Sequence, residues 1–381
     1  MKIINQPARL YFIDNLRVAV IILVVAHHAG QSYGPTGGQW PLFEPVRSPL
    51  LGPFFSVNAT FVMGLFFLIS GYFLPRSYDR KGAGTFLKDR LLRLGIPLLI
   101  FALPLLGPTM YLMEYVPQGG ALSFWQFFIR IYLGKWQVEF AHMWFVAHLI
   151  VYAVGYTLWC QLARRGKPTA RRETPVPGHR AILGYTLTLA VVTAVVRIWY
   201  PINSWERVLR LVPAEFAHLP QYLSLFVIGI VAYRRDWLRR LPTTTGMTWL
   251  GIGLAAALAR YAYSLGGHQL LPSILEDGGL DWRSLVWSIW EALICVGLCV
   301  GLLVLFRERL NGQGKLLPVL SAAVYTVYII HVPVIVGLQF GMVPVALPPF
   351  VKFLLVTLIG VPLCFGISYL IKKLPLARRI L

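Results

Sequence analysis

The sequence contains few charged residues. Asp, Glu, Lys and Arg make up only 13% of its 381 residues, while 57% are hydrophobic, and the mean hydropathy is +0.65. This composition excludes an ordinary soluble domain and is typical of a polytopic membrane protein. The hydrophilic connections are too short to be a separate soluble domain, so residues 1–381 are predicted to form a single membrane domain.

Acidic residues are especially scarce, because 15 Asp and Glu accompany 35 Lys and Arg and leave a net charge of +20. In a soluble protein this excess would suggest a nucleic-acid partner. In a membrane protein it has a better explanation, since Lys and Arg collect in cytoplasmic loops. The predicted partner is therefore the lipid bilayer and not a nucleic acid.

Cysteine is also rare, and its positions exclude two classes of site. All four cysteines lie in apolar segments and are predicted to be small packing residues: Cys160, Cys295, Cys299 and Cys364. Cys295 and Cys299 share a helix face, but no pair of histidines lies near them. The sequence therefore predicts neither a disulfide framework nor a metal centre, and it contains no internal repeat or Gly-rich nucleotide-binding loop.

Long apolar segments, in contrast, are abundant. They predict an all-α fold, a polytopic membrane bundle of about ten transmembrane helices, because about twenty apolar helical residues span a bilayer. The predicted spans are residues 11–31, 54–74, 94–114, 142–162, 181–199, 217–233, 247–264, 284–306, 317–340 and 350–371. Residues 122–133 are rich in aromatics and predict an amphipathic helix at the membrane surface.

The basic residues predict how these spans are oriented. With the N-terminus inside, 26 of the 35 Lys and Arg residues fall in inside segments and six fall in outside loops. This asymmetry predicts that both termini are cytoplasmic. The longest hydrophilic connection, residues 163–180, is then a cytoplasmic linker between two sub-bundles, or it serves only as a topology signal.

The first span carries four ionisable residues, Asp14, Arg17, His27 and His28. Such groups are costly in hydrocarbon and usually face a bundle interior or a water-filled cavity. Arg17 and His28 are eleven residues apart, so they lie on one helical face, within roughly 20° of each other and roughly 16 Å apart along the axis. Asp14 lies at an i,i+3 spacing from Arg17, whereas His27 points about 100° away from His28.

This span also has two simpler interpretations. It could be a secretory signal peptide, although its apolar core is short and is bordered by Arg17. Alternatively, Asp14 and Arg17 could form an interfacial ion pair, with the histidines serving only as satisfied polar groups of the core.

Two elements near the cytoplasmic face predict contacts with a ligand. Ser70 and Gly71 permit close backbone approach by a ligand or, more simply, by another helix. Arg90 and Arg93 are i,i+3 neighbours, and their forked guanidinium groups suit the phosphates of a cytoplasmic ligand. The simpler interpretation of the arginines is that they extend toward lipid headgroups.

The later spans add further polar residues within the bilayer. Among them, Tyr325, Tyr328 and His331 follow one another at three-residue spacing, which predicts one polar stripe along a helix. Polar groups that converge from several spans imply an internal cavity. The candidates are His142, Trp144, His148, Glu291, Tyr325, Tyr328 and His331.

In these motifs the chain resembles the acyltransferase-3 family of integral-membrane acyltransferases over nearly its whole length. The family's first-helix signature, an arginine followed after ten residues by a histidine, matches Arg17 and His28, and the usual Asp-x-x-Arg begins at Asp14. Its other motifs match at Phe66–Tyr72, at Arg90, Arg93 and Pro97, at His142–Phe145, and at Tyr325–Pro333. The opening RLYFIDNLR is most similar to the branch that succinylates periplasmic glucans.

The chain departs from the family pattern at two positions. A serine often precedes the first tyrosine of the late motif, and Val324 stands there in this chain. Some members carry a carboxylate in the fourth span where this chain has His148.

The resemblance implies a reaction and its compartments. The donor is acyl-CoA, either acetyl-CoA or succinyl-CoA, bound from the cytoplasmic side, and no metal is required. The acceptor is a hydroxyl of a glycan or glucan outside the bilayer. The chain is then a multi-pass protein of the bacterial inner membrane.

The resemblance also implies roles for individual residues. His28 is the general base, or it takes the acyl group covalently, and Arg17 with Asp14 forms a polar pair in the lower channel. Arg90 and Arg93 hold the CoA phosphates. The pantetheine arm passes Ser70, Gly71 and Tyr72. The candidates of the later spans are then available to bind substrate.

The alternative to an enzyme is a proton-coupled transporter of a sugar or an anionic metabolite. Such a transporter also needs His, Arg and Glu within the membrane. Transporters often contain inverted repeats, and the sequence shows none. The sequence leaves open the acyl group, the acceptor and whether the chain forms a homo-oligomer.

Overall fold

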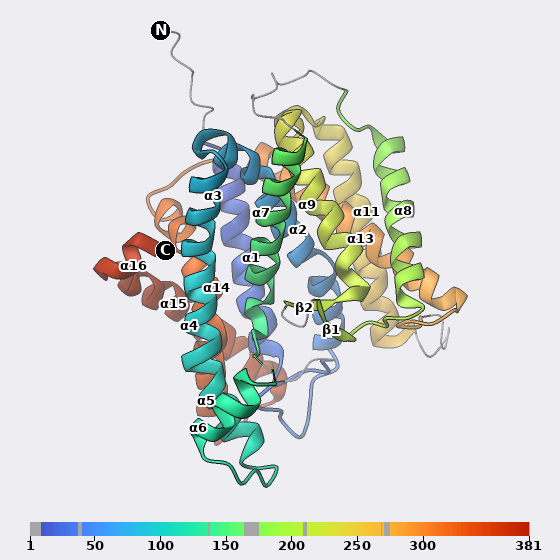
Figure 1. The fold of residues 1–381 in the computed structure, drawn as a ribbon. Coiled ribbons are helices and arrows are strands. Elements are labelled where there is room, and N and C mark those ends of the chain that lie inside the picture. Colours follow the sequence, from blue (N-terminus) through green and yellow to red (C-terminus); the bar gives the residue numbers. More distant parts are fainter. Residues whose placement is uncertain are drawn as a thin grey trace.

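The structure is a computed structural model that describes residues 9–36, 40–135, 138–163, 175–208, 212–267, 269 and 275–380. It confirms the predicted fold class, because its regular structure is almost entirely helical and the long helices run side by side (Figure 1). These helices are α1 (Tyr11–Gly30), α2 (Leu51–Lys81), α7 (Trp144–Leu162), α8 (His179–Arg197), α9 (Leu219–Arg234), α11 (Thr243–Ala262), α13 (Trp282–Arg309), α14 (Leu317–Gly341) and α15 (Pro349–Ile371). The shorter helices are α3 (Ala83–Arg90), α4 (Ile96–Ile100), α5 (Gly107–Met110), α6 (Phe124–Phe127), α10 (Trp237–Arg240) and α16 (Pro375–Ile380).

In the described part of the chain, nine helical segments are long and apolar enough to cross a membrane. They correspond to nine of the ten predicted spans. The tenth, predicted at residues 247–264, is present as α11, which packs along α13. It is less apolar than the other nine because it begins with three threonines and carries Arg260 near its end. A helix therefore occupies each predicted span.

The third span begins earlier than predicted, at Ala83 instead of residue 94. It is one continuous helix in which α3, α4 and α5 alternate with the π-helical turns Leu91–Gly95, Phe101–Leu106 and Tyr111–Tyr115. Several prolines within it lack the N–H that an α-helix needs, and π-helical turns are one way to satisfy the carbonyls they leave unpaired. The two arginines at 90 and 93 therefore lie within the helix and not in a loop before it.

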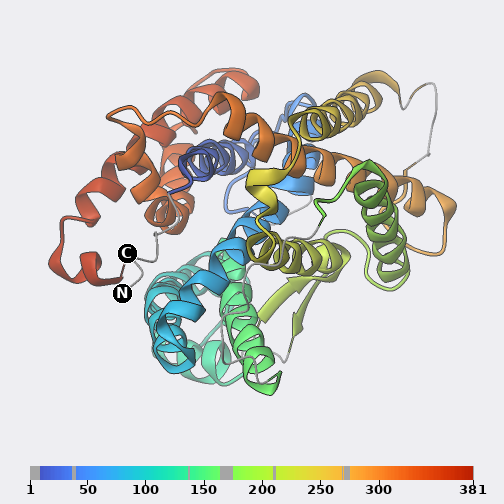
Figure 2. The ribbon, with the colours of Figure 1, turned by 90° about the horizontal axis from the view of Figure 1, so that it is seen from above.

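Helix α1 lies in the interior of the bundle, against α2, α13, α14 and α15. Its side chains Leu16, Ile21 and Val25 are fully buried there. Seen from above, α14 and α15 lie to one side of α1, α8 and α11 lie on the far side of the molecule, and α3 with α7 form a third group (Figure 2). This position lets polar residues of α1 contact several other helices.

Helices α2 and α9 pack with their backbones in close contact. A Cβ atom on Gly71 would lie 2.1 Å from the carbonyl oxygen of Phe226, and one on Gly229 would lie 2.1 Å from that of Leu68. Small residues allow this approach, which is a common means of helix association in membranes. Of the two interpretations of Gly71, the structure supports helix packing.

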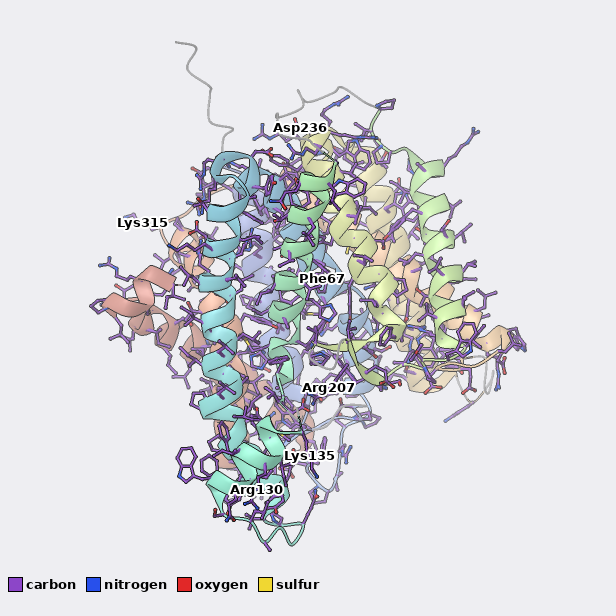
Figure 3. The ribbon with its side chains drawn as sticks, viewed as in Figure 1. Phe67, Arg130, Lys135, Arg207, Asp236 and Lys315 are labelled. Carbon is purple, nitrogen blue, oxygen red and sulfur yellow. The ribbon has the colours of Figure 1, made fainter. Side chains whose placement is uncertain are left out.

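The connections contain structure that the apolar pattern shows only in part. The helix predicted at residues 122–133 is present as α6 and the π-helical turns Phe128–Leu133. Between α8 and α9 lies an unpredicted antiparallel hairpin, β1 (Trp205–Val208) and β2 (Val212–Glu215). Arg207 ties it to the segment before α7, because its guanidinium donates to the Val138 carbonyl (2.8 Å) and pairs with Glu139 (Figure 3). Most of the predicted linker, residues 164–174, lies outside the described residues.

Candidate active site

Three histidines from separate segments meet near the end of α1. His28 belongs to α1, His142 to the 3₁₀ turn Ala141–Met143 before α7, and His331 to α14. The ring centres of His28 and His331 are 4.7 Å apart, those of His142 and His331 are also 4.7 Å apart, and His28 lies 6.4 Å from His142. We call these three residues the histidine cluster.

Hydrogen bonds fix the tautomers of two rings in this cluster. The Nδ1 atom of His28 lies 2.9 Å from the carbonyl oxygen of Val24, and a carbonyl can only accept, so a neutral His28 carries its proton on Nδ1. By the same reasoning His331 donates from Nδ1 to the Tyr328 carbonyl (2.7 Å) and can accept at Nε2. The Nε2 lone pair of His28 has no hydrogen-bond partner among the described residues.

The third histidine is held by α14. His142 donates from Nε2 to the carbonyl oxygen of Ile329 (3.2 Å), and the Tyr328 hydroxyl donates to the His142 carbonyl. The three rings cross at 67–76° and their N–H groups point to backbone carbonyls instead of to a common centre. Within the described chain, no group of three or more His, Cys, Asp or Glu residues is placed to hold a metal ion.

Two further residues, Trp40 and Gln339, lie at the histidine cluster and were not predicted from the sequence. Trp40 places its ring 5.5 Å from that of His28, and its Nε1 donates to the side-chain oxygen of Gln339 (2.8 Å). Gln339 is fully buried in α14 and donates to the carbonyl oxygens of His28 and Ala29 (3.0 and 3.1 Å). These contacts connect the end of α1, the α1–α2 connection and α14.

The other histidine of the first span faces a different environment. His27 packs against Phe55 at 5.1 Å between ring centres, and its Nδ1 atom is buried without a hydrogen-bond partner in the described structure. This agrees with the predicted divergence of the two neighbouring side chains on the helix.

The charged residues of α1 lie at its opposite end. Asp14 accepts a hydrogen bond from Arg9 (2.7 Å) and lies 3.7 Å from the guanidinium of Arg17. Arg17 and His28 are therefore separated by roughly 16 Å along the helix. Asn15, which follows Asp14, donates to the carbonyl oxygens of Leu310 and Gly312 and so fixes the connection between α13 and α14.

The two arginines of the third span lie at the same end as Arg17. The guanidinium of Arg90 lies over the Phe86 ring at 5.5 Å, and the side chain of Arg93 is exposed. Neither arginine has an ion-pair partner among the described residues. Tyr325 of α14 donates from its hydroxyl to the Arg93 carbonyl (2.8 Å), so the predicted stripe on α14 runs from these arginines to the histidine cluster.

Comparison with known proteins identifies the family. Residues 10–371 match the model of the acyltransferase-3 family, described as an acyltransferase domain. The chain belongs to the acyltransferase-3 family. Similar curated proteins include those named glucans biosynthesis protein C from Salmonella paratyphi B, Salmonella dublin and Salmonella enteritidis, each 25% identical over 347 residues, covering 86% of this chain and 83% of the relative. No solved structure matches the chain.

As a member of this family the chain is a multi-pass membrane acyltransferase and needs an acyl donor. The predicted donor-binding residues of α2 are Ser70, Gly71 and Tyr72. Gly71 faces α9 and leaves no room for a ligand at that point. Tyr72 is buried, with its ring 5.5 Å from that of Tyr233. Ser70 is half-buried and is the more accessible of the three.

Two candidates of α7 lie among aromatic side chains and apart from the histidine cluster. Trp144 contacts the rings of Tyr222 and Trp205 at 5.4 and 5.6 Å, and its ring centre lies 6.2 Å from that of Phe67. His148 donates from Nε2 to the Pro213 carbonyl (3.0 Å), while its Nδ1 lies 3.4 Å from the Tyr152 hydroxyl. Both ring nitrogens of His148 therefore have protein partners.

Glu291 is likewise separate from the histidine cluster. It pairs with the fully buried Arg197 of α8, accepts a hydrogen bond from Trp287 (2.9 Å) and lies 3.7 Å from His218. His218 also contacts Glu215 at 2.8 Å. Burial alone would raise the pKa of Glu215, but His218 holds it below its ordinary value. This ionic cluster joins α8, α13, the hairpin and the 3₁₀ turn Phe216–His218 before α9.

Proposed function

We propose that this family member is an O-acyltransferase that moves an acetyl or succinyl group from cytoplasmic acyl-CoA to a hydroxyl of an extracytoplasmic glucan or related glycan. Membership of the family supports the transfer reaction. The name of the relatives, glucans biosynthesis protein C, supports a glucan as acceptor. The transporter alternative has no such support.

The observation that carries this proposal is the Nε2 atom of His28, which has no hydrogen-bond partner in the part of the chain that the structure describes. With its proton held on Nδ1 by the Val24 carbonyl, the ring presents a lone pair that can act as a general base. The Nε2 atom takes the proton of the acceptor hydroxyl as its oxygen attacks the thioester carbonyl. The carbon–sulfur bond then breaks, and the CoA thiolate receives the proton from His28.

The donor side of the proposal rests on Arg90 and Arg93. Two guanidinium groups that have no carboxylate partner among the described residues suit a ligand with several phosphates, because forked donors bind phosphate oxygens in pairs. The hydrogen bond from Tyr325 to the Arg93 backbone fixes this end of the stripe on α14. The acyl chain would then extend past Ser70 toward His28, with Arg17 and Asp14 lining the entrance.

The compartments follow from the same arrangement. The arginines and His28 lie toward opposite ends of α1, so donor and acceptor approach from opposite faces. We place the arginine end and both termini in the cytoplasm, consistent with the excess of Lys and Arg in those segments. The protein is then an inner-membrane enzyme whose acceptor arrives from outside.

The direct test uses the purified full-length protein in lipid nanodiscs with a glucan oligosaccharide and either acetyl-CoA or succinyl-CoA. We expect release of free CoA together with a glucan that gains the mass of one acyl group. Rapid quenching without acceptor shows whether label first accumulates on His28. With the protein in sealed vesicles instead of nanodiscs, movement of unmodified glucan across the vesicle membrane without CoA release would instead support a transporter.

A further inference from the structure

We propose that the indole of Trp40 is the surface on which a sugar ring of the acceptor stacks, and that Gln339 positions it beside His28. This inference rests on the proposed function and adds a specific acceptor-binding residue to it.

The α1–α2 connection that carries Trp40 is fastened to the bundle. The backbone N–H of Glu44 donates to the carbonyl oxygen of Ser32 (3.0 Å), and Lys352 of α15 donates to the Glu44 carboxylate (2.6 Å). The Trp40 indole is itself bonded to Gln339, which is fully buried. Its position is therefore set before an acceptor arrives, which lowers the cost of ordering the site on binding.

What Trp40 can offer a ligand is the face of its ring. Its only hydrogen-bond donor, Nε1–H, is already used by Gln339. The side chain is half-buried, so part of it stays accessible to a ligand. A pyranose ring has an apolar face of C–H groups and a polar rim of hydroxyls, and an aromatic ring with its polar atom occupied complements the apolar face.

The distance from Trp40 to His28 suits such a ligand. A hydroxyl that His28 deprotonates must lie within about 3 Å of its Nε2 atom. The sugar ring that carries this hydroxyl then extends a few ångströms further, and the Trp40 ring centre lies 5.5 Å from that of His28, with a tilt of 40° between the planes. One sugar can therefore contact the base and the indole together.

Gln339 acts through Trp40 and is a positioning residue. Its side-chain oxygen holds the indole, while its NH₂ group holds the carbonyl oxygens of His28 and Ala29. Gln339→Met keeps the length of the side chain but releases the indole and the carbonyl oxygens of His28 and Ala29. We expect it to raise the KM for the acceptor and to leave the KM for acyl-CoA unchanged, a split that a general loss of structure would not produce.

The decisive experiment measures binding of a fluorescently labelled β-glucose pentasaccharide to the full-length protein in nanodiscs, without acyl-CoA. We expect Trp40→Leu to weaken binding about tenfold or more, because it removes the aromatic face, and Trp40→Phe to weaken it less, because it keeps an aromatic face but loses the bond to Gln339. The matched control is Trp125→Leu, since Trp125 lies on α6 with 67% of its surface exposed. Size-exclusion chromatography of each variant serves as the check that it is folded.

Three results would overturn the inference. The first is pentasaccharide binding by Trp40→Leu that equals wild type, and the second is a wild-type protein that does not bind the sugar. The third is a rise in the KM for acyl-CoA in Trp40→Leu with the acceptor KM unchanged, which would assign Trp40 to the donor. If the wild type binds the pentasaccharide but transfers no acyl group, the proposed function fails while the Trp40 comparison still decides this inference.

Discussion

The Nε2 atom of His331 lies 3.3 Å from the Nδ1 atom of His28. Since His331 donates from its own Nδ1 to the Tyr328 carbonyl, its Nε2 can accept a hydrogen bond from His28. His28 thus has two acceptors, Val24 and His331, on the side of its ring opposite the free Nε2 atom. Both favour the tautomer that a general base requires, and both stabilise the positive charge that forms when the base takes a proton.

This relationship predicts that His331 orients the base. His331→Leu removes one of the two acceptors and leaves the Val24 carbonyl. We expect kcat to fall by up to roughly tenfold, the scale of one hydrogen bond, with the KM for acyl-CoA unchanged. Steady-state kinetics with both substrates varied would show this split. A parallel rise in both KM values would mean that His331 contacts substrate.

For His28 itself, the expected loss is larger. His28→Gln keeps hydrogen-bonding capacity but cannot take up a proton at neutral pH. We expect acyl transfer to fall by about 10²–10⁴-fold, the usual contribution of a general base, while acyl-CoA still binds. The matched control is His27→Ala, because His27 faces Phe55 and should retain most activity. If His28→Gln kept activity near wild type and His27→Ala were inactive, the base would be His27 and not His28.

The donor site is tested through Arg90 and Arg93. Replacing either by Ala should raise the KM for acyl-CoA more than it lowers kcat, because phosphate contacts are made before and during the reaction alike. Lysine should restore binding only in part, since it cannot make a forked contact. Arg130→Ala is a suitable control, because Arg130 lies on the helical segment after α6, at the other end of the molecule (Figure 3). Donor kinetics unaffected by the Arg90 and Arg93 changes would leave them as lipid-facing residues.

The orientation in the membrane is tested by cysteine labelling in intact cells. The native cysteines are free and buried, so a new surface cysteine reports its own side. We expect a cysteine at Thr169, in the predicted linker, to be protected from an impermeant reagent, and one at Gln118, in the exposed turn before α6, to be labelled. Labelling of the Thr169 variant would reverse the proposed topology.

Helical spacing explains how much of the site could be predicted. In a helix, spacing fixes the face of a residue, so the separation of Arg17 from His28 and the stripe through Tyr328 and His331 were readable from sequence. The same eleven-residue spacing relates Tyr328 to Gln339 and could have revealed it. Trp40 gave no such signal, because its position beside His28 depends on how an irregular connection folds over the bundle.

Residue spacing does not show which helix faces pack against each other, and this limited the prediction for the other polar residues. Glu291 was a candidate for substrate binding because a lone carboxylate in a span is costly. Its partner Arg197 stands far from it in sequence, at the end of another span, so only the packing of α8 against α13 reveals the pair. His148 has Tyr152 as a partner on its own helix, but its second partner, the Pro213 carbonyl, could not be predicted for the same reason: it depends on the hairpin folding against α7.

The ion pair between Glu291 and Arg197 therefore predicts an effect on stability and not on chemistry. Arg197 is fully buried, and removing one partner of a buried pair leaves an uncompensated charge, which typically costs about 3–5 kcal/mol. We expect Glu291→Leu to lower the thermal unfolding temperature of the detergent-solubilised protein strongly. The double variant Glu291→Leu with Arg197→Met should recover much of that loss, because it removes both charges and keeps the apolar volume. The folded fraction of the double variant should transfer acyl groups with a near-normal kcat. A folded and stable double variant with a raised acceptor KM would instead return Glu291 to the acceptor site.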